Sequence, residues 1–137
     1  MKCIKMEIVT SYYANQKALR KAGFKICSIS VGDSRWCPPD ISLKMFAPTR
    51  AMLSMSKENY DKHYTKILEK IDIDFLRSYL RELERVGITK MALCCHEADH
   101  HECHRKRVGE YLSIKLMQEI EEFGLSKNPK TEQREMF

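Results

Sequence analysis

Residues 88–95, Ile-Thr-Lys-Met-Ala-Leu-Cys-Cys, are the segment that most constrains how this chain can fold. Their nearly continuous apolar character is typical of a β-strand that is covered on both faces, as in a parallel sheet. The segment that follows, 103–123, repeats apolar residues at every fourth position, namely Val108, Leu112, Leu116 and Ile120, which predicts an amphipathic helix. A buried strand followed by a helix indicates an α/β protein, because the helix must pack back onto the sheet.

Strand-like runs and helical segments alternate along the rest of the chain. The predicted strands are residues 3–10, 24–31 and 88–95. The predicted helices are residues 16–22, 49–55, a segment capped by Ser56, a segment from Asp72 to Gly87, and 103–123. Because strands separated by helices pair in parallel, we expect an α/β fold with a small parallel, Rossmann-like three-layer sheet and flanking helices. The first strand is expected in the middle of this sheet.

Length and composition predict one folded unit without a membrane segment. We expect residues 1–124 to form a single α/β domain and residues 125–137, which carry mixed charge and few apolar side chains, to form a loose C-terminal tail. No apolar run reaches the roughly 18 residues that a membrane helix needs. The N-terminus does not resemble a signal peptide, so the expected location is cytoplasmic. The sequence contains nothing that indicates an oligomeric state.

The charge balance permits an anionic partner. The chain has a net charge of +5, which suits either a small anionic ligand or nucleic acid. Nucleic acid is the weaker expectation, because the sequence contains no arginine–glycine tract, aromatic–basic repeat or zinc-finger spacing.

Candidate ligand-binding residues follow from the expected sheet, because ligands of such sheets bind beyond the carboxyl ends of the strands. This rule brings together three loops, which contain Ser11 and Tyr12, Arg35 and Trp36, and residues 94–105. For Trp36 two interpretations stay open. It is either the apolar anchor of its loop or, with Arg35, a wall for a planar or anionic ligand.

The predicted helix at Cys103 begins with cations, His104-Arg-Lys-Arg, where the helix dipole favours anions. Each cation there should cost roughly a few tenths of a kcal/mol. The pattern is explained if a phosphate or carboxylate is bound between these side chains and the backbone amides. We expect Arg105 to be the anion-binding side chain, with a solvated basic face as the alternative.

The same helix start offers a reactive thiol. Cys103 would lie beside His104 and Arg105 at the positive end of the helix, which favours a thiolate. Cys103 or Cys95 would then be the catalytic nucleophile, with Glu97 and His104 as acid–base or orienting groups. The alternative is that Cys103 is inert and only packs. In a reducing cytosol all six cysteines are expected to be thiols.

The crowding of cysteine, histidine and acidic side chains between residues 95 and 104 also invites a metal site. No paired Cys-x-x-Cys is present, however, and adjacent residues seldom bind one ion together. We therefore expect neither a metal nor a cofactor.

Cys95-x-Glu97, five residues, and then Cys103-His104-Arg105 together resemble the signature of the domain of unknown function 488 family, small prokaryotic and viral proteins. The resemblance extends to about Leu116. It also includes residues 9–15 and 28–31, Trp36, residues 47–49, Tyr60 and Tyr64. It implies a compact α/β domain with a Rossmann-like sheet and no settled activity. Cys94, His96, His100 and His101 are not part of the family pattern, and the proline that often follows the glutamate is missing.

These observations predict a protein that binds a small anionic or nucleotide-like ligand above the sheet, with thiol-based catalysis as an extension. Two alternatives stay open. One is a non-catalytic module that binds a nucleotide or a nucleic-acid phosphate. The other is a structural cluster in which Glu97 pairs with Arg105 and Cys103 packs. Whether the protein is an enzyme is open at this point.

Overall fold

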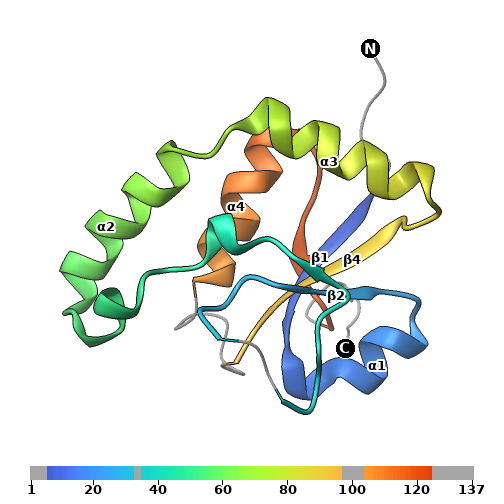
Figure 1. The fold of residues 1–137 in the computed structure, drawn as a ribbon, viewed down its shortest axis with the longest axis horizontal. Helices are drawn as coiled ribbons and strands as arrows, with labels where there is room; N and C mark the ends of the chain where they lie inside the picture. Colours follow the sequence, from blue (N-terminus) through green and yellow to red (C-terminus); the bar gives the residue numbers. More distant parts are fainter. Residues whose placement is uncertain (1–5, 33–34, 97–103, 125–137) are drawn as a thin grey trace, which may run out of the picture.

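The computed structural model describes residues 6–32, 35–96 and 104–124. The strands in these ranges form one sheet, in which every pair of neighbouring strands is parallel (Figure 1). They are β1 (Glu7–Tyr12), β2 (Lys25–Ser28), β3 (Ile41–Ser42), β4 (Lys90–Cys95) and β5 (Glu121–Glu122), in the spatial order β3-β2-β4-β1-β5. The predicted α/β fold with a small parallel sheet is therefore confirmed.

The helices lie close to where the sequence predicts them. They are α1 (Gln16–Lys21), α2 (Lys57–Glu69), α3 (Ile73–Arg85) and α4 (Arg105–Leu116), with 3-10 turns η1 (Tyr13–Asn15), η2 (Lys44–Phe46) and η3 (Arg50–Ser54). Ser56 and Asp72 cap α2 and α3, because their side-chain oxygens accept hydrogen bonds from backbone amides three residues on. Gly87 follows α3 with a positive φ of 97°, a conformation that glycine adopts without strain. The predicted helix 49–55 is a 3-10 helix instead.

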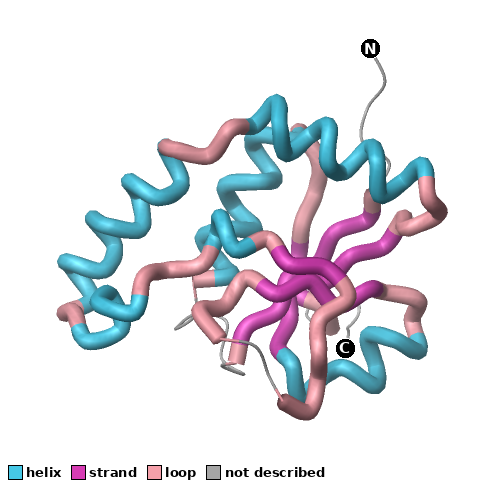
Figure 2. The backbone as a smooth tube through the Cα atoms, in the orientation of Figure 1, coloured by secondary structure: helices cyan, strands magenta, loops and turns pink. Residues whose placement is uncertain are grey.

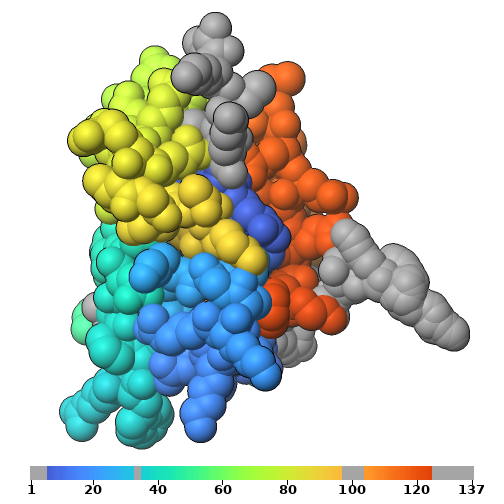
Figure 3. All heavy atoms as spheres, turned by 90° about the vertical axis from the view of Figure 1, so that its right-hand side faces the viewer, coloured from blue at the N-terminus to red at the C-terminus, as the bar shows by residue number. Residues whose placement is uncertain are grey.

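The sheet is covered on both faces, which gives the expected three layers (Figure 2). On one face, Ile8, Met91 and Leu93 pack in a cluster with residues of α2, α3 and α4. On the other face, Ala92 and Cys94 pack with Leu19 of α1. Alternate residues of β4 thus point to opposite clusters, as the pleat requires. From the side, the yellow atoms of α3 lie above the blue atoms of α1 (Figure 3).

The expected strand order was wrong at one point. β4, not β1, lies in the middle of the sheet, with β1 on one side and β2 on the other. Residues 91–95 of β4 are all buried, whereas β1 has exposed or half-buried residues at Glu7, Val9 and Tyr12. A central position suits the strand that is apolar on both faces, because both of its faces are covered.

The last predicted helix was too long. α4 ends at Leu116, and Met117 adopts a left-handed conformation with φ of 56°. The chain then turns back so that Gln118 donates a hydrogen bond to the Met6 carbonyl and Glu121–Glu122 pairs with β1. Ile120 therefore packs against the core from outside the helix. The four-residue spacing of apolar side chains continues past the end of α4, because Ile120 in the returning segment also packs against the core.

Two further expectations concern the ends of the chain and membranes. The predicted tail, residues 125–137, lies outside the described residues. Within the part of the chain that is described, no helix combines the length and the apolarity needed to cross a bilayer.

Candidate functional site

A cavity of about 790 Å³ opens where β2 and β4 end. Three segments line it, which are the loop after β2, the stretch from Pro48 to Asp61, and the end of β4 together with the start of α4. Its lining residues are Ser30, Val31, Gly32, Pro48, Arg50, Met52, Leu53, Met55, Lys57, Tyr60, Asp61, Cys95, His96, His104, Lys106, Arg107 and Glu110. The cavity thus lies at the carboxyl edge of the sheet, where ligands of parallel α/β sheets bind.

Buried hydroxyl groups hold the loop after β2 in place. The Lys44 ammonium donates hydrogen bonds to Ser28 Oγ and to the Ser30 carbonyl, at 2.8 and 2.7 Å. The Tyr13 hydroxyl lies 2.9 Å from Ser28 Oγ and 2.6 Å from Ser30 Oγ. Both serines are buried, so these bonds satisfy groups that are shielded from water. They position the part of the cavity wall that Ser30 and Gly32 form.

The charges of the lining residues are predominantly positive. Four cations, Arg50, Lys57, Lys106 and Arg107, share the cavity with two carboxylates, Asp61 and Glu110. The lining therefore carries a net charge of +2 with both histidines neutral. Each carboxylate already lies beside a cation, since Lys106 pairs with Glu110 at 2.8 Å and Lys57 with Asp61 at 3.1 Å. A wall with this excess of positive charge favours an anion.

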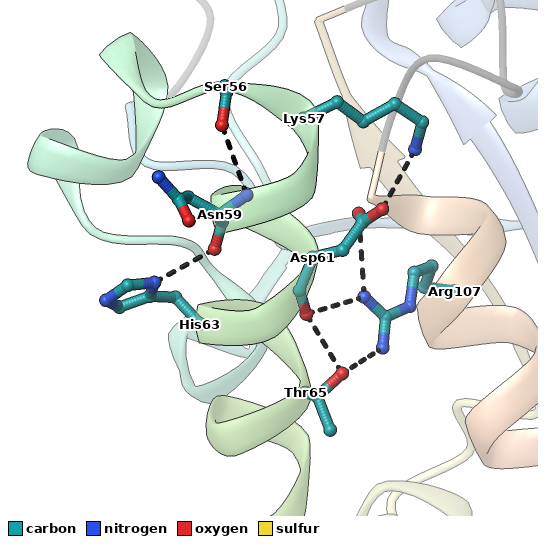
Figure 4. A network of polar contacts seen from close by, with 7 residues as sticks. All are labelled: Ser56, Lys57, Asn59, Asp61, His63, Thr65 and Arg107. Carbon is teal, nitrogen blue, oxygen red and sulfur yellow. Dashed lines mark hydrogen bonds and ion pairs between the residues drawn. The ribbon is translucent and has the colours of Figure 1, made fainter.

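Arg107 connects the two sides of the cavity (Figure 4). Its guanidinium donates hydrogen bonds to the Asp61 carbonyl and to Thr65 Oγ1 on α2, at 3.2 and 2.8 Å. Its Nη1 also lies 3.8 Å from the Asp61 carboxylate. Side chains from α4 and α2 thereby meet in one network, which fixes Arg107 at the edge of the cavity.

His104 and His96 both lie in the cavity wall, and each bonds to a backbone carbonyl. His104 Nε2 is 2.6 Å from the Ile29 carbonyl oxygen, and His96 Nε2 is 2.8 Å from that of Gly32. A carbonyl only accepts, so Nε2 carries the proton in both rings. The basic nitrogen of each neutral ring is then Nδ1. His104 is one of the predicted site residues, whereas His96 is not part of the family pattern and was not predicted to belong to the site.

Arg105, the expected anion-binding side chain, is completely buried and does not line the cavity. Its Nε and Nη2 donate to the two carboxylate oxygens of Glu122, at 3.0 and 2.8 Å. Its Nη1 donates to Cys95 Sγ at 3.0 Å, and the ring of Tyr12 lies 5.7 Å from its Cζ. Successive helix residues are rotated by about 100°, so Lys106 and Arg107 reach the cavity while Arg105 points inward. The start of α4 thus lines the cavity through Lys106 and Arg107, whereas Arg105 does not line it.

Cys94 and Cys95 are both buried, with exposed fractions of 0% and 1%, but they differ in bonding. Cys95 lines the cavity and forms a disulfide bond, which departs from the expectation that all six cysteines are thiols. A nucleophilic Cys95 therefore requires the reduced protein. The neighbouring thiol is different, because burial raises the pKa of Cys94 to about 12. Cys94 is thus the inert, packing thiol.

Among the described residues, the other predicted site residues do not line the cavity, and they are Ser11, Tyr12, Arg35 and Trp36. Ser11 is fully buried, and its Oγ accepts a hydrogen bond from Asn15. The Trp36 side chain is 87% exposed, so it does not anchor its loop, and Arg35 is exposed as well. Two predicted residues, Glu97 and Cys103, lie outside the described residues.

Sequence reasoning missed the second side of the cavity. Arg50, Lys57 and Tyr60 lie in η3 and the first turn of α2, far in sequence from the cysteine–histidine stretch. Tyr60 stacks on the buried Tyr64, with 6.0 Å between the ring centroids. The one signal available was a pair of cations, Arg50 and Lys57, around the cap residue Ser56.

The comparisons with known proteins add no relative, since neither a family model, nor a curated protein, nor a solved structure matches this chain. The resemblance to the domain of unknown function 488 family therefore stays an expectation. Among the residues that are described, no three histidine, cysteine, aspartate or glutamate side chains gather as metal ligands would. The stretch with His100 and His101 lies outside those residues.

Proposed function

We propose that this protein binds a small anionic ligand in the cavity beside β2, β4 and the start of α4. The observation that carries the proposal is the net charge of +2 on a concave surface at the carboxyl edge of a parallel sheet. The site differs from the one expected at Arg105, because that guanidinium is already engaged by Glu122. The cations that line the cavity are Arg50, Lys57, Lys106 and Arg107, and they are partly exposed, whereas Arg105 is fully buried.

The arrangement suits a phosphate or carboxylate group of a small molecule. Cations reach the cavity from η3, from the start of α2 and from the first turn of α4, so an anion can be contacted from more than one side. Arg107 is held in place by Thr65 and Asp61, which reduces the entropy that a bound anion would otherwise cost. The volume lies within the roughly 300–1,000 Å³ of small-molecule sites.

Removing two of the cations should weaken anion binding without affecting the fold. The variant Arg50→Gln with Lys106→Gln is expected to bind inorganic phosphate at least about tenfold more weakly, since a hydrogen bond to a charged group contributes about 1.5–3 kcal/mol. The measurement is titration calorimetry at low ionic strength, supported by the rise in melting temperature that a ligand of the folded state produces.

The matched control is Lys62→Gln with Lys66→Gln, which removes the same charge from exposed positions of α2 outside the cavity. Phosphate affinity of this control should equal that of the wild-type protein. If both double variants bind phosphate equally weakly, the overall charge of the protein explains the effect and the cavity cations are not the binding groups. If neither phosphate nor sulfate binds to the wild-type protein, the proposal is refuted.

Thiol–disulfide exchange at Cys95 is a second candidate function. It is favoured by the 3.0 Å contact between Arg105 Nη1 and Cys95 Sγ, because a neighbouring guanidinium stabilises a thiolate. The reduced Cys95 thiolate would attack one sulfur of a small organic disulfide, forming a mixed disulfide and releasing the other half as a thiolate. An external thiol would first have to reduce the disulfide that Cys95 forms.

Cys95 and Cys94 provide an internal comparison for this reaction. After reduction and removal of the reductant, native protein treated with cystamine is expected to carry the mixed disulfide at Cys95 and not at Cys94, whose pKa burial raises to about 12. Peptide mass spectrometry against reaction time gives both rates. If Cys95 reacts no faster than a small model thiol at neutral pH, the candidate fails.

A further inference from the structure

We infer that the ligand of this cavity is a nucleoside monophosphate, an anion that carries a flat apolar ring. This inference rests on the proposed function and names its ligand class. It starts from the uneven distribution of polarity around the cavity. Most apolar side chains of the lining belong to one segment, residues 48–60. This segment contributes Pro48, Met52, Leu53, Met55 and Tyr60, together with the cations Arg50 and Lys57.

The side chains of this segment can pack against an aromatic ring of a ligand. Tyr60 lines the cavity and stacks on Tyr64 with an angle of 23° between the ring planes. Arg107 Cζ in turn lies 5.5 Å from the ring of Tyr64. Methionine side chains adapt to flat surfaces, and two of them, Met52 and Met55, belong to the same wall. A nucleobase packed there would replace water on an apolar surface.

A second part of the lining is mainly polar and charged. It is formed by the first turns of α4, which present His104, Lys106 and Arg107, and by His96 at the end of β4. The contact between Arg107 and Asp61 places this wall beside the residue that follows Tyr60. A phosphate monoester carries about −1.5 to −2 at neutral pH, which matches the net charge of +2 of the whole lining, Arg50 and Lys57 included. One ligand can therefore contact both walls.

Inorganic phosphate would fill only part of this cavity. The volume of about 790 Å³ exceeds what an inorganic anion fills, and the apolar wall would then stay in contact with water. Leu53 illustrates the point, because it is 61% exposed although it lines the cavity. A ligand with a ring covers such a side chain, whereas phosphate does not.

The test compares ligands that differ by one part. Calorimetric titrations of the full chain use adenosine monophosphate, ribose 5-phosphate, inorganic phosphate, adenosine and phenyl phosphate. Adenosine monophosphate is expected to bind at least about fivefold more tightly than ribose 5-phosphate, which lacks the base, because base stacking on aromatic side chains contributes that much or more. Adenosine, which lacks the phosphate, should bind more weakly than either.

Variants then assign the two walls. Leu53→Ser and Tyr60→Leu should lower the affinity for adenosine monophosphate at least about threefold and leave that for ribose 5-phosphate unchanged. The control Ile114→Ser removes an exposed apolar side chain of α4 that lies outside the cavity, and it should change neither affinity. Because Leu53 is largely exposed, its replacement tests the wall even if Tyr60→Leu fails to fold.

The outcomes distinguish a failure of the nucleoside monophosphate inference from a failure of the proposed anion binding. Equal binding of adenosine monophosphate, ribose 5-phosphate and phosphate would overturn the ring contact while leaving anion binding intact. If phenyl phosphate binds as tightly as adenosine monophosphate, the ligand class is aryl phosphates in general and not nucleoside monophosphates. Adenosine binding as tightly as its monophosphate, or no binding of any phosphorylated compound, would refute the anion site itself.

Discussion

The variant Glu122→Gln is expected to lose about 3–5 kcal/mol of the free energy of unfolding, because it leaves the buried Arg105 guanidinium without a compensating charge. The two side chains are 0% and 7% exposed and form a two-pronged contact, with Nε and Nη2 donating to the two carboxylate oxygens. Thr10 Oγ1 donates to the same carboxylate at 2.6 Å. Urea titration monitored by circular dichroism measures the loss.

Two controls isolate the ion pair. Glu119→Gln changes the same charge at an exposed position three residues earlier and should shift stability by less than about 0.5 kcal/mol. The double variant Arg105→Met with Glu122→Leu removes both charges and should be more stable than Glu122→Gln, because no buried charge is then left unpaired. A loss below about 1 kcal/mol for Glu122→Gln would show that Arg105 does not need this partner.

Alkaline pH is expected to destabilise the protein steeply above about pH 9. Burial raises the pKa of Cys94 from an ordinary value near 9 to about 12, and burial also raises the pKa of Cys27, with the nearby Cys94 adding to the effect. A raised pKa in the folded state means that the unfolded thiols deprotonate first. The stabilisation is therefore complete below about pH 9 and is lost as pH rises toward the folded-state pKa values.

The size of the alkaline effect follows from linkage. Each thiol that is deprotonated only in the unfolded state costs about 1.4 kcal/mol per pH unit, so two thiols cost on the order of 5 kcal/mol between pH 9 and pH 11. Urea titrations under argon at pH 8, 9, 10 and 11 give the slope. The double variant Cys27→Ala with Cys94→Ala should show a clearly smaller slope, and an unchanged slope would contradict the assignment to these thiols.

The ion pair of Arg105 and Glu122 also explains why the site lies where it does. It attaches the two-residue strand β5 to the start of α4, 17 residues earlier in the chain. With Arg105 fixed inward by Glu122 and Cys95, the next two residues of the helix are directed to the cavity. The same contact therefore contributes to the stability of the fold and to the position of the cavity cations.

Much of the local structure could be predicted from the sequence, because it depends on neighbouring residues. Ser56 and Asp72 predicted the starts of α2 and α3, because a side-chain oxygen just before a helix accepts a hydrogen bond from one of its first free backbone amides. The run 88–95 announced a strand buried on both faces, which it is. The cations after Cys103 indicated that the first turn of α4 is positively charged, with no acidic residue to offset the helix dipole.

What only the tertiary structure decided are the pairings between distant segments. Local periodicity contains no information about which strand is central, about the pairing of Arg105 with Glu122, or about Arg50, Tyr60 and Lys106 lining the same cavity. These contacts join residues that are 17 to more than 50 positions apart, and they are selected by the packing of the whole core. The sequence by itself thus determined most of the elements and predicted the edge of the sheet at which the cavity lies. Packing decided which side chains reach it, because burial of Arg105 turns its neighbours outward.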